Sequence, residues 1–312
     1  MRRSIMSGLA GTLLASSLLV LAGCGGKQAP DQEAAASPAG PPPAPTLEQL
    51  KGATVSGVFD QAVTLVDGKY DGPPPVAGAA SHPTLMLWEP AVVFGDVDGA
   101  AGSEAVAMLS SNSGGSGEFV YVAVFGMRDG KLENLGTAPV GDRTRLQSLW
   151  LQGGRVVMDV VEAGPADPAC CPTQIARKTY AFAGGTLKQS KSEVLGTLTV
   201  GTLSANEWQL VSIDSQPLPA DTKPPVIHFD RDGIRGFAGC NRFTASVKET
   251  APGVIQVGPP AATRMACPGP EMDLEQAFLA GLAKTNGYTF LAGRLALTWT
   301  DKNGSGRMLF AK

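Results

Sequence analysis

The five cysteines carry the most reactive side chains of this 312-residue chain. Cys24 stands alone near the N-terminus, Cys170 and Cys171 are adjacent, and Cys240 and Cys267 lie in the C-terminal third. A cysteine thiol can be acylated, oxidised to a disulfide or bound to a metal ion. The surroundings of each cysteine decide between these chemistries.

Cys24 closes the sequence Leu-Ala-Gly-Cys, which follows Arg2, Arg3 and an uncharged stretch over residues 4–23. This layout predicts a secretory signal peptide over residues 1–23, with small residues at its cleavage site. The cysteine resembles that of a bacterial lipobox, in which the thiol is lipidated and becomes the first residue of the mature chain. A transmembrane anchor is the alternative, but serine, glycine and threonine dilute the apolar run, and an anchor needs no cysteine.

A lipobox implies where the protein is attached. We expect acyl chains on Cys24, palmitate included, to hold the protein at a membrane, because the chain has no Lys and Arg cluster that would bind anionic lipid. Lipoproteins that carry Asp after the cysteine are typically retained at the inner membrane of Gram-negative cells. Gly25 occupies that position here, which predicts an outer-membrane protein that faces the periplasm.

The other four cysteines are expected to form disulfides, since an exported protein folds in an oxidising compartment. Cys170 and Cys171 lie between Pro168 and Pro172, where a vicinal disulfide would act as a rigid loop clamp or, alternatively, as a redox switch. Cys240 and Cys267 are expected to pair with each other. A zinc site is the alternative for this pair, but the module has no other thiol and His228 is its only histidine, so a four-ligand site lacks partners.

An acidic segment over residues 95–104 is a candidate metal site. It is similar to the Asp-x-Asp-Gly-Asp-Gly calcium loop of FG-GAP-type β repeats, and Asp96, Asp98 and Glu104 would supply the hard oxygen ligands that Ca²⁺ prefers. Ala100 stands where the third carboxylate is expected. We therefore favour an acidic turn between two strands and keep the calcium site as a hypothesis.

Motifs of the common enzyme classes do not occur in the sequence. The chain has two histidines, and it contains no Gly-x-Ser-x-Gly elbow, no His-Glu-x-x-His helix and no glycine-rich phosphate loop. Its net charge of −3 and its 17% of charged residues exclude the electrostatic pattern of a nucleic-acid-binding protein. We expect no enzymatic activity and no cofactor; a glycan hydrolase with two carboxylates is the least favoured alternative.

The composition favours a mainly β protein with two modules. The chain has 39 glycines and 24 prolines, and its Val- and Thr-rich runs are typical of strands between turns. Residues 24–46 are rich in Pro and Ala and predict an extended tether behind the lipidated cysteine. We place an antiparallel β module at residues 47–195 and a second module at residues 198–312.

The first module is expected to consist of strands joined by short turns. Gly153 and Gly154 separate two apolar-rich runs, which is a signal for a two-residue hairpin. Phe119–Phe125 predicts a well-buried strand. The other predicted strands are Ala105–Leu109, Arg145–Gln152, Arg155–Glu162 and Ala176–Ala183.

The second module is expected to contain short strands and one helix. The helix is predicted over Glu271–Lys284, with an apolar stripe of Met272, Leu274, Ala277, Phe278 and Leu282 and an end at Asn286-Gly287. Turn residues separate the predicted strands at the spacing of a sandwich or barrel. These strands are Trp208–Ile213, Val226–Asp230, Ile234–Phe237, Phe243–Val247, Val254–Val257, Tyr288–Leu291, Leu295–Trp299 and Met308–Phe310.

Three motifs in the second module occur in the order and spacing of a known family. Pro224–Phe229, then Gly-Cys-Asn-Arg-Phe over 239–243, then Thr-Arg-Met-Ala-Cys over 263–267 precede an acidic helix. Together they resemble the META domain of HslJ-type heat-shock lipoproteins. The resemblance implies a small curved antiparallel sheet, or partial barrel, with one packed helix. It also implies an envelope or stress-response protein, since the family has been linked to heat shock and novobiocin tolerance, and it implies no catalytic residue.

Asn241 and Arg242 are the candidate recognition residues of this module, although an Asn in a turn more often satisfies local backbone groups. From all these observations we expect a non-catalytic binding or envelope-maintenance protein whose partner is an envelope protein or the cell wall. A chaperone-like stress factor or a protease inhibitor is the alternative, and it would expose an apolar patch.

Overall fold

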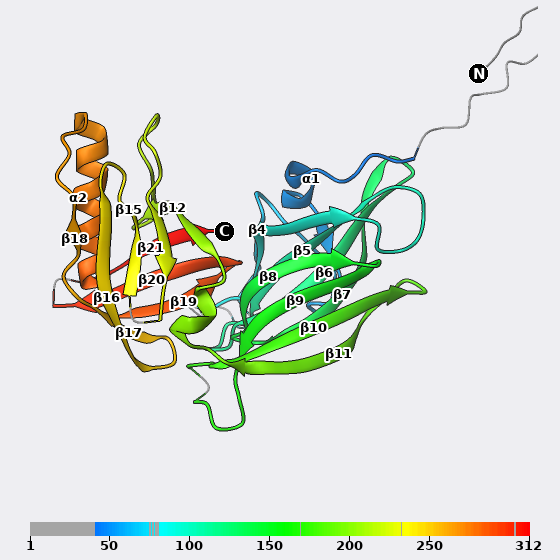
Figure 1. Cartoon of the computed structure of the whole chain (residues 1–312). Helices are drawn as coiled ribbons and strands as arrows, with labels where there is room; N and C mark the ends of the chain where they lie inside the picture. Colours follow the sequence, from blue (N-terminus) through cyan, green and yellow to red (C-terminus); the bar gives the residue numbers. More distant parts are fainter. Residues whose placement is uncertain are drawn as a thin grey trace, which may run out of the picture. The chain divides into compact units, whose positions relative to one another are not determined.

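Antiparallel strands account for most of the chain in this computed structural model (Figure 1). The structure describes residues 41–312 except residues 75, 77, 79, 80, 169, 232 and 303. The predicted signal peptide, Cys24 and most of the tether therefore lie outside the described residues. The described part falls within a single unit, Gly40–Lys312.

Residues 47–197 build two larger sheets and a small hairpin. A five-stranded sheet has the order β3-β4-β5-β6-β7, and a four-stranded sheet has the order β11-β10-β9-β8. The elements are α1 (Leu47–Lys51), β1 (Thr54–Val55), β2 (Val63–Thr64), β3 (Lys69–Asp71), β4 (Thr84–Gly95), β5 (Glu104–Asn112), β6 (Phe119–Arg128), β7 (Lys131–Asp142), β8 (Arg145–Gln152), β9 (Arg155–Glu162), β10 (Gln174–Ala183) and β11 (Thr186–Thr197). The expected antiparallel β architecture is confirmed.

The five-stranded sheet is buried on both faces. On one face, Val122 packs in a core cluster with Met158 of the four-stranded sheet. On the other face, Phe125 packs in a second cluster with Leu50 of α1. Because β5 and β6 are covered on both faces, their sequences are nearly continuous apolar runs, which is why they were recognisable as strands.

Residues 207–311 form one sheet that closes on itself. The strand order is β12-β14-β15-β16-β17-β19-β20-β21, and β21 pairs with β12 to complete an eight-stranded ring. The predicted partial barrel is therefore a closed one. The elements are η1 (Val200–Leu203), β12 (Glu207–Ile213), β13 (Gln216–Pro217), β14 (Val226–Phe229), β15 (Gly233–Phe237), β16 (Arg242–Ala251), β17 (Val254–Val257), β18 (Ala261–Ala262), α2 (Gly269–Lys284), β19 (Gly287–Leu291), β20 (Arg294–Asp301) and β21 (Gly304–Ala311).

Helix α2 packs its apolar stripe into the core of this barrel. The Phe278 ring lies edge-on to Phe243 of β16, with centroids 5.4 Å apart, and 6.5 Å from the ring of Phe310 of β21. The predicted stripe holds at Leu274, Phe278 and Leu282 but is wrong at Ala277, which is exposed. Glu275 is buried instead, and its carboxylate has a structural role described below.

Candidate functional site

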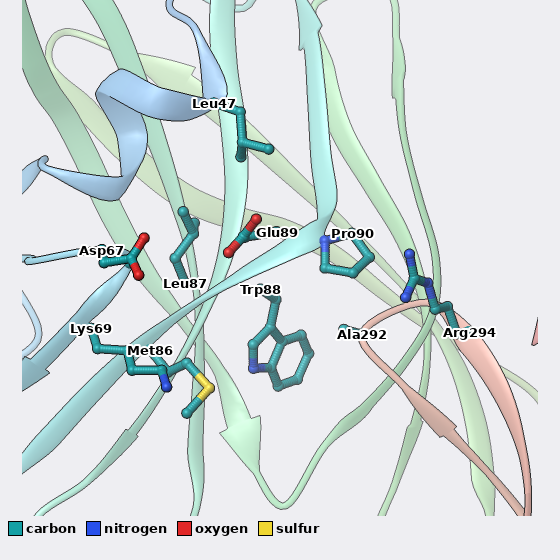
Figure 2. Close-up of a pocket in the computed structure, with 11 residues that line it drawn as sticks. Leu47, Asp67, Lys69, Met86, Leu87, Trp88, Glu89, Pro90, Ala292 and Arg294 are labelled. Atoms are coloured by element: carbon teal, nitrogen blue, oxygen red, sulfur yellow. The ribbon is translucent and has the colours of Figure 1, made fainter. Parts of the chain in front are cut away.

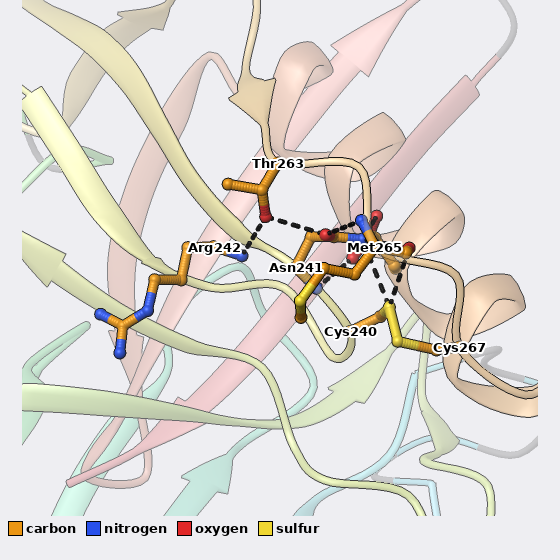
Figure 3. Close-up of a disulfide and its surroundings, with 7 residues drawn as sticks. Cys240, Asn241, Arg242, Thr263, Met265 and Cys267 are labelled. Carbon is orange, nitrogen blue, oxygen red and sulfur yellow. Dashed lines mark hydrogen bonds between the residues drawn. A yellow bond between two sulfur atoms is a disulfide. The ribbon is translucent and has the colours of Figure 1, made fainter.

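The Asn241 side chain lies at the centre of a buried hydrogen-bond cluster (Figure 3). Its Oδ1 accepts from the Thr263 hydroxyl at 2.8 Å and from the Met265 N–H at 2.7 Å, and its Nδ2 donates to the Met265 carbonyl at 3.2 Å. The neighbouring Cys240 is joined to Cys267 by a disulfide. Two motifs that are far apart in the sequence are thus held together by one amide and one covalent bond.

Helix α2 contributes the third part of this cluster through Glu275, whose carboxylate is 6% exposed. Its Oε2 accepts from the Asn241 backbone N–H at 2.6 Å, and its Oε1 accepts from the Asn241 Nδ2 at 3.1 Å. A buried carboxylate is costly unless it is hydrogen-bonded, and these two bonds meet that need. Asn241 is therefore a structural residue and not a recognition residue, because its side chain is 1% exposed and its polar atoms are occupied.

The backbone of Arg242, the residue after Asn241, is held by Thr263 of the same cluster. The Arg242 backbone N–H donates to the Thr263 hydroxyl, and its carbonyl accepts from the Thr263 N–H. Arg242 itself is exposed, and Figure 3 shows its side chain pointing away from Asn241. Within the described part of the chain, no hydrogen bond or ion pair engages its guanidinium. Of the two predicted recognition residues, only Arg242 is at the surface.

A groove of about 400 Å³ lies beside Arg242 on the outer face of β14, β15 and β16. Cross-strand register places Phe237 directly opposite both Val226 and Arg242, and it places Arg235 opposite His228 and Thr244. These outward-facing side chains of neighbouring strands line the groove. The barrel thus presents an aromatic ring and a guanidinium side by side in one cross-strand row.

The other charged groups of the groove are paired. The Arg235 Nε donates to the Asp230 carboxylate at 2.8 Å, and the His228 Nε2 lies 3.1 Å from a Glu207 carboxylate oxygen. Arg242 is consequently the cation that is available to a ligand at this face. A planar guanidinium recognises a carboxylate or phosphate group through two parallel hydrogen bonds.

The three predicted calcium ligands do come together. Oxygen atoms of Asp96, Asp98 and Glu104 lie within 4.8 Å of one another. Each already has a partner in the protein: Asp96 accepts from the Gly99 N–H, Asp98 from the Ala100 N–H, and Glu104 from the Val97 N–H at 2.9 Å. These hydrogen bonds hold the segment in an ordered acidic turn.

Arg128 adds a positive charge to this acidic turn. Its guanidinium bonds Asp98 and lies 3.7 Å from Glu104, whose side chain is 1% exposed. Arg128 is far from the turn in sequence, so the sequence alone does not connect it with the acidic residues. The sequence offers one indication of this contact: a basic residue, Arg128, ends strand β6, which is the second strand after the turn. Arg128 offsets one of the three negative charges of the cluster with a cation from the protein itself.

Cys170 and Cys171 form a disulfide in an exposed loop that Asp167 organises. The Asp167 carboxylate accepts from the Gly164 N–H at 2.8 Å and from the Thr173 N–H at 2.7 Å. These backbone hydrogen bonds, the one from Gly164 above all, hold the pKa of Asp167 below its ordinary value because they stabilise the charged form.

Comparison with known proteins identifies the barrel. Residues 201–312 match the family model described as "META domain". The barrel is a META domain. The disulfide and the Asn241 cluster show why its two motifs occur together: they are the two halves of one buried contact.

Two solved structures are similar to this chain. One is an NMR structure of a protein from Burkholderia xenovorans, with 22% sequence identity, a TM-score of 0.30, and coverage of 39% of this chain and 95% of that chain. The other is an NMR structure with 24% identity, a TM-score of 0.29, and coverage of 36% of this chain and 94% of that chain. No curated protein matches the chain. Among the described residues, no helix has the length and apolar character needed to cross a bilayer.

Proposed function

We propose that this chain is a lipid-anchored, non-catalytic binding protein of the bacterial cell envelope, and that the Arg242 groove of its META domain is the binding surface. The proposal combines the predicted lipidation at Cys24 with the groove. In this account the acyl chains attach the protein to the outer membrane, and the Pro- and Ala-rich tether lets the META domain reach a partner in the periplasm or in the cell wall.

One observation supports binding through this groove most directly. An unpaired guanidinium is exposed on a strand whose backbone is fixed from the other side by the disulfide, by Asn241 and by Glu275. Because the backbone is already fixed, only the Arg242 side chain loses conformational freedom when it engages a ligand, so the geometry favours recognition of an anionic group. The Phe237 ring beside it would add apolar contact area.

Site-specific photocrosslinking in intact cells tests the proposal. A benzoylphenylalanine replaces Thr244, an exposed residue that lines the groove, and a second strain carries it at Lys188, an exposed residue of β11. We expect one dominant, saturable adduct from position 244 and no such adduct from position 188. An absent adduct at position 244, or the same pattern from both positions, would contradict the groove. A broad set of unfolded proteins would favour the chaperone-like alternative.

The anchor is tested separately. The Cys24→Ser variant should leave the membrane fraction as a soluble protein or remain an unprocessed precursor, as shown by fractionation and by the loss of metabolically incorporated palmitate. A processed, membrane-bound Cys24→Ser protein would overturn the lipidation part of the proposal and leave the groove untouched.

A further inference from the structure

A second cavity, of about 600 Å³, lies along β4 and has no part in the Arg242 groove. Figure 2 shows the Trp88 indole in the middle of the lining side chains, between Met86 and Ala292, with Glu89, Asp67 and Arg294 around it. A cavity of this volume is within the range of about 300–1,000 Å³ that is usual for small-molecule sites.

An irregularity of β4 brings Trp88 into this cavity. Leu87 pairs with Leu109 and Val92 pairs with Ala107, so residues 88–91 stand opposite the single residue Met108. Such a bulge redirects side chains and is common next to binding sites. Pro90 lies inside the bulge, where its missing N–H costs no ladder hydrogen bond.

The indole ring is held in one orientation. Its Nε1 donates to the Ser110 hydroxyl at 3.0 Å, and part of the ring packs on the apolar core. Because the N–H is already satisfied, the indole offers the cavity its apolar ring surface and no free hydrogen-bond donor. Met86, which is 46% exposed, adds a second apolar contact.

Polar groups surround this aromatic face. Asp67 lies in a tight turn with Gly68, where both residues have positive φ (50° and 77°), and it shares the Lys51 ammonium with Glu89. The Lys51 distances are 3.5 Å to Asp67 and 3.7 Å to Glu89. Arg294 also lines the cavity, and in the described part of the chain its guanidinium has no hydrogen bond or ion pair.

We infer that this cavity binds a carbohydrate, with one pyranose ring against Trp88. A pyranose has an apolar C–H face, which matches the negative π face of an indole, and an edge of hydroxyl groups. The carboxylates of Asp67 and Glu89 accept hydrogen bonds from hydroxyls, and Arg294 donates to ring or acetamide oxygens. A purely apolar ligand would desolvate these charged groups without offering them hydrogen bonds, which is unfavourable. The inference is independent of the Arg242 groove.

Tryptophan fluorescence of the full-length protein tests this inference. The protein is kept in a detergent without a sugar head group and is titrated with tri-N-acetylchitotriose, with maltotriose and, separately, with a short-chain fatty acid. We expect a saturable fluorescence change with at least one trisaccharide, at a dissociation constant of about 1 mM or tighter.

Variants assign the change to the cavity. Trp88→Leu should abolish the saturable signal, and Glu89→Gln, which changes an exposed side chain, should weaken binding about tenfold when it is measured by saturation-transfer NMR. Trp150→Leu is the matched control: it removes another half-buried tryptophan, one that stacks under Arg177, and it should leave the affinity unchanged.

Melting temperatures of all variants report whether they fold. Three results would each overturn the inference. The first is unaltered trisaccharide binding in both Glu89→Gln and Trp88→Leu, and the second is no response to either trisaccharide up to about 10 mM. The third is saturable binding of the fatty acid alone.

Discussion

At the scale of single residues, several polar side chains that could bind a ligand instead make hydrogen bonds or ion pairs within the protein. Asn241 forms hydrogen bonds to the Thr263–Cys267 motif and to helix α2, Arg128 places a positive charge beside the acidic turn, and Asp167 organises the disulfide loop. Asn241 was a candidate recognition residue, with hydrogen bonding to nearby backbone groups as the more common alternative for an Asn in a turn, and the structure shows the structural role. Neither Glu275 nor Arg128 was found, because their partners are close only in the folded chain.

One clue to Glu275 was present in the sequence. Glu275 lies three and seven positions before Phe278 and Leu282, so it belongs to the same stripe of helix α2 as these buried residues. A carboxylate on an apolar stripe implies an internal partner. The identity of that partner, a backbone N–H and an amide of Asn241, required the fold.

The Asn241 cluster predicts a strongly destabilised variant. Asn241→Ala should lower the free energy of unfolding by about 2–4 kcal/mol, because it removes the side-chain hydrogen bond to the buried Glu275 carboxylate and leaves the Met265 N–H without its acceptor. Urea unfolding of the variant and of Thr244→Ala, an exposed neighbour on β16, measures this difference. Equal stability of the two variants would show that the cluster is not internal.

In the acidic turn, we expect that Ca²⁺ can take the place of the Arg128 guanidinium once that side chain is removed. Arg128→Met should lower the free energy of unfolding by about 2–4 kcal/mol, because the buried Glu104 loses its positive partner. Millimolar Ca²⁺ should then raise the melting temperature of the variant but not that of the unaltered protein, since three carboxylates with oxygens within 4.8 Å of one another would no longer have a competing guanidinium beside them. A calcium-dependent rise in the unaltered protein would contradict this account.

Asp167 predicts a specific pH dependence. Its folded-state pKa is below that of the unfolded chain, so its charge stabilises the fold at a pH above the unfolded value, and this contribution is lost as the pH falls through the folded value. Asn mimics the protonated acid. The melting temperatures of the protein and of Asp167→Asn should therefore differ above about pH 5 and converge toward pH 1. A constant difference across this range would exclude the effect.

At the scale of elements, the META barrel was more predictable than the module before it. Its strands are short and alternate cleanly, as in Phe243, Ala245 and Val247 of β16, which point inward. Strand β11 has one buried residue, Leu187, so no apolar alternation marked it. Strand β4 was not predicted because its bulge interrupts the alternation at residues 88–91.

The two disulfides should differ in their effect on stability. Removing the Cys240–Cys267 bond by a double Ser substitution should cost about 3.5 kcal/mol in the chain-entropy model, since it closes a loop with a sequence separation of 27. The Cys170→Ser, Cys171→Ser protein is the control, because a bond between adjacent residues closes almost no loop. Comparable losses in the two proteins, measured by urea unfolding, would contradict this ranking.

At the scale of the whole molecule, we propose that the N-terminal end attaches the protein to a membrane and the C-terminal META domain binds the partner. The N-terminal lipid anchor is proposed from residues that the structure does not describe, and the binding surface is proposed from the Arg242 groove on the outer face of the META domain, where the Arg242 guanidinium is unpaired. Sequence motifs located Arg242 but could not reveal its groove, because the groove depends on the register of β14, β15 and β16.

The most direct test of the Arg242 groove compares two single-charge variants in the strain that carries the photocrosslinker at position 244. Arg242→Ala removes the unpaired guanidinium, and Lys248→Ala removes an exposed cation of the same strand outside the groove. The account predicts that Arg242→Ala reduces the dominant adduct at least tenfold at equal protein level, whereas Lys248→Ala leaves it unchanged. An adduct that survives Arg242→Ala, or that falls equally in both variants, would contradict it.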